Sequence, residues 1–267
     1  MFLRKYLLKQ AIKQNSYFIW KNESKSIQPI KSFKPLNLDL IIGVERQKNI
    51  LLNNTRSFAE GNFTNNALLW GARGNGKSSL IKSVFHEVLS TFKTLKLIQL
   101  NKDNIFDIEF IYQLIDKFTD YRFIIFIDDL SFEKIDSDYK IIKSTLDGSI
   151  QNQPNNILLY VSSNRRHLMP RDMIDNERSS AIHTDESVEE KISLSDRFGL
   201  WIGFHKLSQI DYLKIIQTYC EYYKINYDEN IKKKAIQWSL QRGNRTGRTA
   251  WQFILDTASN QNLKINF

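Results

Sequence analysis

The sequence has few cysteines and histidines, and its apolar runs are short. Cys220 is the only cysteine in 267 residues, so no internal disulfide can form and a reducing compartment is expected. The four histidines are scattered without metal-ligand spacing, which argues against a zinc centre. No apolar run approaches the ~20 residues that cross a bilayer, and the N-terminal residues lack the pattern of a secretory signal. We therefore expect a cytoplasmic protein with no membrane span.

The positive charge of the chain is concentrated at its N-terminal end. The net charge is +9, and residues 1–40 hold eight basic residues against two acidic ones. Such a leader suits nucleic acid, anionic lipid or an acidic protein surface. The alternative, which the apolar spacing favours, is a solvated helix that packs on the body. Pro29 and Pro35 indicate a linker, so we predict a helical leader and linker over residues 1–37. The apolar residues expected to pack are Phe2, Leu3, Tyr6, Leu7 and Ile12.

The most informative segment is residues 71–78, which read Gly-Ala-Arg-Gly-Asn-Gly-Lys-Ser, a complete Walker A sequence. Residues 67–70 before it read as a buried strand, and residues 79–85 after it have the spacing of an amphipathic helix. A strand, a glycine-rich turn and a helix N-terminus present backbone N–H groups to phosphates. Lys77 can reach the β- and γ-phosphates, and Ser78 can ligate Mg²⁺. The predicted nucleotide-binding residues are Gly71, Ala72, Arg73, Gly74, Asn75, Gly76, Lys77, Ser78 and Ser79.

A second motif supplies carboxylates. The apolar run 123–127 is followed at once by Asp128 and Asp129. An apolar strand that ends in acidic residues delivers them to the carboxyl edge of a parallel sheet, where ligands bind. Asp128 suits a Walker B role, in which it holds Mg²⁺ together with Ser78. Asp129 is placed to orient or deprotonate an attacking water.

The order of apolar runs predicts the architecture. Buried strands alternate with amphipathic stretches, which is typical of a parallel sheet covered on both faces. After Lys206 the strand pattern ends and three helical patterns follow. We therefore predict an α/β domain over residues 38–206 and a small helical domain over 207–267. The strands expected besides 67–70 are 95–100, 123–127, 157–161 and 200–204, and the last helices are 208–223, 230–241 and 249–260.

Polar residues follow the strand at 157–161. Asn164 at such an edge can hydrogen-bond a γ-phosphate or the attacking water, although an ordinary turn asparagine has the same pattern. Residues 165–167 (Arg-Arg-His) form the densest cationic point of the body. They can meet a phosphate or a neighbouring subunit, and a solvated loop is an equal alternative.

Two further arginines stand near expected element ends. Arg197 precedes the last strand and can reach a γ-phosphate bound by an adjacent subunit, which is worth on the order of 10³–10⁵ in rate. The alternative is a surface ion pair between Arg197 and Asp196, and the sequence favours neither interpretation over the other. Arg248, near the start of the last helix, can approach the phosphates from the helical domain, with Arg245 as its substitute.

Together these motifs resemble an AAA+ ATPase over about residues 38–260. The resemblance implies a P-loop NTPase fold, an α/β five-stranded parallel sheet sandwiched by helices and followed by a small all-helical lid domain. It also implies ATP and Mg²⁺ as ligands, a homo-oligomer when ATP is bound, and a protein or nucleic-acid client that the sequence does not identify. In this resemblance Asn164 is similar to sensor 1, Arg197 to the arginine finger, Arg248 to sensor 2, and Ile42 and Gly43 to the element that contacts the adenine.

The sequence is closer still to a bacterial AAA+ group catalogued only as a domain of unknown function. The resemblance rests on residues 71–79, 128–132, 162–168, 190–199 and 242–248. It implies ATP binding and the fold, and it implies no particular substrate.

One departure from the AAA+ pattern concerns turnover. The usual Walker B ends in Asp-Glu, whereas this one ends in Asp128-Asp129. Asp129 is one methylene shorter than glutamate, and a small misplacement of a catalytic group can cost ~10²-fold. Glu133 is the nearest substitute. We expect an ATPase, and the alternative is a nucleotide-gated loader or adaptor switch in DNA metabolism with negligible turnover.

Overall fold

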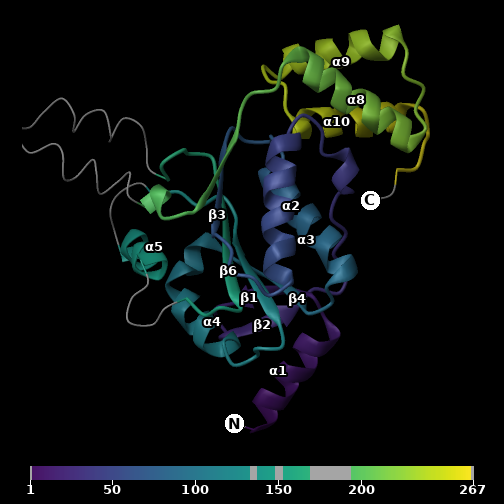
Figure 1. Cartoon of the computed structure of the whole chain (residues 1–267). Coiled ribbons are helices and arrows are strands. Elements are labelled where there is room, and N and C mark those ends of the chain that lie inside the picture. The colour runs from purple at the N-terminus through teal and green to yellow at the C-terminus, as the bar shows by residue number, and fades with distance from the viewer. Residues whose placement is uncertain (1, 133–136, 148–152, 169–193, 266–267) are drawn as a thin grey trace, which may run out of the picture.

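The computed structural model describes residues 2–132, 137–147, 153–168 and 194–265. It has an α/β body built on one sheet and a cluster of three helices at one end of that body (Figure 1). Among the described residues, no helix is long and apolar enough to cross a membrane.

The sheet confirms the five predicted strands and adds two more. Its order is β2-β1-β4-β5-β6-β3-β7. The five predicted strands lie side by side and pair in parallel. The expectation of a five-stranded sheet is therefore wrong in number, because the described residues alone form seven strands in this sheet. The five predicted strands are β3 (Ala67–Gly71), β4 (Leu95–Leu100), β5 (Arg122–Ile127), β6 (Ile157–Ser163) and β7 (Leu200–Phe204).

The two additional strands come from the segment expected to be a helical leader and linker. After α1 (Phe2–Gln14), β1 (Tyr17–Lys21) pairs in parallel with β4, and β2 (Ser26–Pro29) pairs antiparallel with β1. Phe18 and Trp20 are buried in the core of the body. Burial alternates along β1, as the two-residue period of a strand requires. The pattern was missed because five residues are too short for this period to stand out.

The expected packing of α1 is only partly correct. Ile12 is fully buried in the core of the body. Tyr6 and Leu7 are 59% and 57% exposed, so the prediction that these two side chains pack on the body is wrong. The side chains of Phe2 and Leu3 lie outside the described part of the chain.

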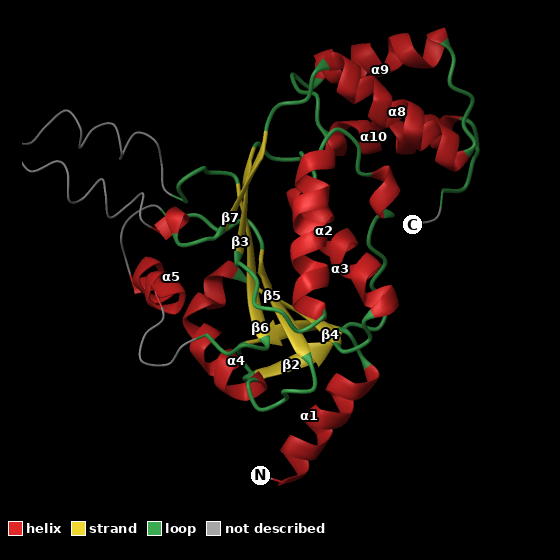
Figure 2. Cartoon of the chain, in the orientation of Figure 1, coloured by secondary structure: helices red, strands yellow, loops and turns green. Residues whose placement is uncertain are grey.

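Helices cover both faces of the sheet, as the alternation of strand and helix predicted (Figure 2). One face, with Ile124 and Phe126, packs against α2 (Glu45–Ala59) and α3 (Lys77–Thr91). The other face, with Ile125 and Ile127, packs against α4 (Ile108–Ile115) and α5 (Ser137–Asp147). Successive strand residues point to opposite faces, so both cores are filled by the same apolar run.

The three helices at the C-terminal end form a domain with its own core. They are α8 (Gln209–Tyr223), α9 (Glu229–Gln241) and α10 (Gly247–Asn260), close to the predicted bounds. Each begins at a side-chain cap, from Ser208, Asp228 and Thr246 respectively, and such caps satisfy backbone N–H groups that have no partner within the helix. We call these three helices the lid.

Candidate functional site

A cavity of about 740 Å³ lies between the body and the lid. Its polar end is formed by residues 73–79, Asp128, Asp129, Ser162 and Asn164. Its other end is largely apolar. The structure therefore brings together the two sequence motifs and the asparagine that were predicted to share a site.

The glycine-rich turn between β3 and α3 has the backbone that its glycines allow. Gly71, Gly74 and Gly76 have φ of +135°, +80° and +89°, in the region that disfavours residues with a Cβ. A Cβ on Gly71 would lie 2.0 Å from the carbonyl oxygen of Phe204, whereas one on Gly76 would meet nothing within 4 Å. Gly71 is thus required by the close approach of β7, and Gly76 faces open space at the start of α3.

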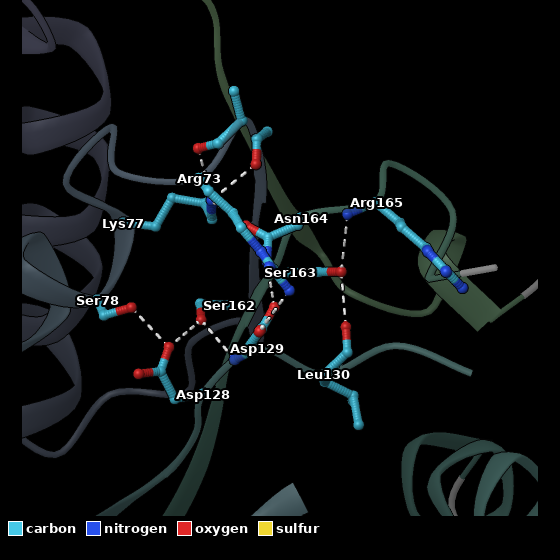
Figure 3. Close-up of polar contacts among 12 residues, drawn as sticks. Arg73, Lys77, Ser78, Asp128, Asp129, Leu130, Ser162, Ser163, Asn164 and Arg165 are labelled. Atoms are coloured by element: carbon cyan, nitrogen blue, oxygen red, sulfur yellow. Dashed lines mark hydrogen bonds and ion pairs between the residues drawn. The ribbon is translucent and has the colours of Figure 1, made fainter. Parts of the chain in front are cut away.

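Lys77 is a buried cation, with its residue only 6% exposed. Its Nζ donates to the carbonyl oxygens of Gly71 (2.7 Å) and Ala72 (3.0 Å) and to Asn164 Oδ1 (3.0 Å) (Figure 3). Burial lowers the pKa of Lys77 to about 8, although nearby carboxylates oppose the shift. Only neutral oxygens are bonded to this ammonium group, so it can gain an anionic partner. Gly71 and Ala72, which were predicted to bind nucleotide, contact Lys77 and are not among the residues that line the cavity.

Asp128 and Ser78 offer the oxygen atoms that magnesium prefers. Ser78 Oγ and Ser162 Oγ both donate to Asp128 Oδ1 at 2.5 Å (Figure 3). A carboxylate and a hydroxyl are hard oxygen ligands, which suit Mg²⁺. Within the described residues there is no cluster of three or more His, Cys, Asp or Glu that could hold a metal. With one hydroxyl and one carboxylate, Ser78 and Asp128 could hold an ion such as Mg²⁺ that keeps several waters and also binds phosphate.

Asp129 is held in an unusual backbone conformation beside Asp128. Its φ is +54°, which aspartate tolerates better than most residues. Its N–H donates to Ser162 Oγ at 3.0 Å. Its carboxylate accepts a hydrogen bond from Asn164 Nδ2 and lies 3.4 Å from Arg73 Nη2 (Figure 3). Asn164 thus contacts both Lys77 and Asp129.

Sequence reasoning missed one contact and one residue of this site. The pairing of Arg73 with Asp129 joins residues far apart in the sequence, and nothing in either motif indicates it. Ser162 bonds both Asp128 and Asp129. It ends an apolar strand next to the strand of the two aspartates, and that position was the available signal.

The lid contributes an arginine to the cavity. Arg248 lines it, and its backbone N–H donates to the Gly74 carbonyl oxygen at 3.2 Å. Arg245, considered as its substitute, does not line this cavity, and its Nη2 donates to Gln209 Oε1 at 3.3 Å. Of the two arginines, Arg248 is the one that can approach a ligand held by residues 73–79.

The other cationic candidates lie outside the cavity. Arg197 is half-buried before β7 and is not among the described residues that line it. Arg165 Nη1 donates to the Phe132 carbonyl oxygen at 3.0 Å, and the Arg166 guanidinium lies 4.8 Å from the ring centroid of Trp201. Arg165 is thus half-buried and Arg166 exposed in the loop that follows β6, and both interpretations of these arginines stay open. Glu133 lies outside the described residues.

The apolar end of the cavity combines chain segments from both domains. Ile42, which was predicted to contact adenine, lines it, whereas Gly43 is not among the lining residues. Gly43 has φ +82° and forms the turn that follows Ile42. Tyr219 and Trp251 of the lid complete this end. Trp251 packs against the core of the lid, and its partly buried side chain also borders the cavity.

Solved structures include several with a similar fold. Domain III of the Thermotoga maritima replication initiation protein DnaA has a TM-score of 0.57 at 12% identity, covering 86% of this chain and 91% of that one. A mutant form of Thermotoga maritima RuvB has a TM-score of 0.56 at 18% identity, and the match covers 87% of this chain and 69% of that one. The Aeropyrum pernix ORC1 protein, solved in complex with DNA, has a TM-score of 0.56 at 14% identity, and the match covers 86% of this chain and 65% of that one. These three proteins are AAA+ ATPases.

The likeness to these structures shows the fold, and the sequence itself shows the family. No curated protein matches the sequence. The model of one family matches residues 13–261, which is most of the chain. The chain therefore belongs to the family described as "Protein of unknown function (DUF815)", and its α/β body with a helical lid has the fold of these AAA+ structures.

Proposed function

We propose that this protein binds ATP with Mg²⁺ and hydrolyses it, and that the nucleotide state controls its contact with a macromolecular client. The observation that carries the proposal is the cavity with unlike ends. A desolvated ammonium group and two carboxylates lie at one end, and apolar side chains from body and lid lie at the other. A nucleoside triphosphate has the same two parts, a polyphosphate and a flat base.

The charged residues divide the chemistry among themselves. Lys77 and Arg248 bind and orient the terminal phosphates, and Ser78 and Asp128 hold the metal. Mg²⁺, when bound, neutralises charge on the phosphate oxygens. Asp129 accepts a hydrogen bond from the attacking water, and Asn164 fixes the carboxylate that does so. The Asp129–Asn164 hydrogen bond supports this assignment.

Phosphate release combined with calorimetric ATP binding tests the proposal. Lys77→Ala is expected to abolish both. Asp129→Asn is expected to keep ATP binding and to lower turnover by ~10²-fold or more, because the water loses its acceptor. Asp120→Asn is the matched control, since Asp120 is exposed and far from the cavity. An intact protein that binds no ATP in the presence of magnesium would overturn the proposal.

The rival function is a nucleotide-gated switch with negligible turnover. The short Asp129 side chain favours it, and tight ATP binding without phosphate release in the intact protein would support it. A loader or adaptor role in DNA metabolism is the form that the similar structures suggest, since one is a replication initiation protein and another was solved with DNA. Lys9→Gln with Lys13→Gln on α1 tests the leader for salt-sensitive DNA binding. Deleting the whole leader would remove β1 and β2 from the sheet.

We further propose that Arg197 acts on the nucleotide of a neighbouring subunit. Its place outside the cavity of its own chain supports this role. Light scattering is expected to give a larger mass with a slowly hydrolysed ATP analogue than with ADP. Arg197→Ala is expected to lower turnover in the assembled protein and to leave ATP affinity nearly unchanged. A monomer in both nucleotide states would remove the role in trans.

A further inference from the structure

A second cavity, of about 720 Å³, adjoins the nucleotide cavity. Gly74 and Arg248 line both cavities and are joined by their backbone hydrogen bond. Gly247 and Trp251 face the nucleotide cavity, whereas Thr249 and Gln252 on another face of α10 line the second one. The contact between the glycine-rich turn and the start of α10 therefore separates two distinct spaces.

The charged residues that line the second cavity are basic. There are five of them, and none of the described residues in its lining is an aspartate or glutamate. Only one of the five has an ion pair with a described carboxylate, the 3.4 Å contact between Arg73 and Asp129. A concave surface lined by one sign of charge concentrates ligands of the opposite sign. The basic residues are Arg73, Lys206, Arg242, Arg245 and Arg248.

Arg245 has a donor that nothing in the described chain satisfies. Its Nε is buried without a hydrogen-bond partner, and its Nη2 contacts the neutral amide oxygen of Gln209. An unpaired buried donor on a charged group is costly. Arg242 is also without a carboxylate partner among the described residues, and its guanidinium stacks on the Trp238 ring at 3.4 Å from the centroid. Both arginines can gain from an anionic ligand in the cavity.

We propose that this cavity is a second anion site that binds phosphate groups, either of a nucleic-acid backbone or of a free polyphosphate. Arginine forks match the oxygens of phosphate, and α10 adds the positive end of a 14-residue helix. Among the described residues that line the cavity none is aromatic, so it has no aromatic platform for bases and its arginines are suited chiefly to phosphates.

Occupation of this site is coupled to the nucleotide cavity. Arg73 and Arg248 line both spaces, so two anionic ligands share the same cations. The two ligands therefore weaken each other's binding, and by linkage the effect is equal in both directions. This coupling rests on the proposed nucleotide site, but the second anion site itself does not.

The test is made in a Lys77→Ala background, because this substitution is expected to remove phosphate binding at the glycine-rich turn. The result then does not depend on whether the nucleotide cavity binds ATP. The probes are a fluorescent single-stranded oligothymidylate, followed by anisotropy, and inorganic tripolyphosphate, followed by calorimetry. Arg242→Gln with Arg245→Gln is expected to weaken binding of the active probe by about tenfold or more. It should also lower the salt slope for the oligonucleotide by roughly 1.4.

Two further variants make the result decisive. Lys233→Gln with Lys234→Gln removes the same charge from exposed positions of α9 outside the cavity and is expected to keep most of the binding. Lys206→Gln alters the wall formed by the body and should weaken binding even if the lid arginines affect folding.

Each outcome has a defined meaning. Binding of only the oligonucleotide or only tripolyphosphate supports the site and identifies the source of its phosphates. Binding of neither probe, equal losses in the cavity variants and the α9 control, or equally tight binding of polyglutamate would overturn the proposal.

Discussion

The lowered pKa of Lys77 makes nucleotide binding depend on pH in a way that can be calculated. The free ammonium group has a pKa of about 8 because burial disfavours its charged form. A bound polyphosphate favours that form, so the pKa must rise on binding. The neutral fraction must then take up a proton when ATP binds. We expect uptake of roughly 0.1 proton at pH 7, half a proton at pH 8 and about 0.9 at pH 9.

The same shift weakens binding at alkaline pH. Between pH 7 and pH 9 the protonated fraction of free Lys77 falls about tenfold, so ATP affinity should fall about tenfold, or about 1.4 kcal/mol. The second pKa of a phosphate ester is near 6, so the nucleotide contributes little to the change above pH 8.

Calorimetry in buffers of different ionisation enthalpy measures the proton uptake directly. Lys77→Arg is the control, because a guanidinium stays charged at these pH values, and its binding heat should not depend on the buffer. Equal heats for the intact protein in all buffers at pH 9 would refute the reasoning, since they would show that Lys77 is already fully protonated there.

Three other predictions concern stability and turnover. Burial lowers the pKa of Lys96 from 10.5 to about 8, so the unfolded state binds more protons between these values. The free energy of unfolding should therefore rise from pH 8 to pH 10.5 by at most about 3 kcal/mol, and Lys96→Met should remove that part of the rise in urea titrations. Gly71→Ala should cost about 3 kcal/mol or more because of its clash with Phe204. Gly76→Ala, with open space, should cost only about 1–2 kcal/mol of backbone strain, so equal losses would contradict the clash. Asp129→Glu should not raise phosphate release, since glutamate is less suited to φ +54°; a rise would show that side-chain length limits turnover.

Much of the fold could be predicted because its strands are short, continuous apolar runs. Such runs are typical of strands buried on both faces, and β5 shows why, since Ile124 and Ile125 enter different cores. The glycine-rich turn was equally predictable, because the positive φ of Gly71, Gly74 and Gly76 is a conformation that glycine adopts and other residues disfavour. The local sequence determines these features almost completely.

Other features depend on contacts that no local pattern reports. The pairing of β1 with β4 places Phe18 beside Ile98, and a five-residue strand carries too little periodicity to predict such a distant pairing. The surface exposure of Tyr6 and Leu7 also depends on where α1 ends and β1 begins. Trp251 has the pattern of a core residue, and only its position at the junction of body and lid makes it border the cavity.

The arrangement of the polar end indicates how a nucleotide would be sensed. Asn164 accepts a hydrogen bond from Lys77 and donates one to Asp129. In the proposed site, one side chain thus joins the cation that would bind phosphate to the carboxylate that would orient the water. A phosphate that attracts Lys77 leaves the Asn164 oxygen without its donor, and the amide that fixes Asp129 is then free to reorient. Arg73 Nη2 lies 3.4 Å from Asp129, and Arg73 also lines the second cavity. In the proposed mechanism, the phosphates and an anion near the lid would therefore act on the same carboxylate.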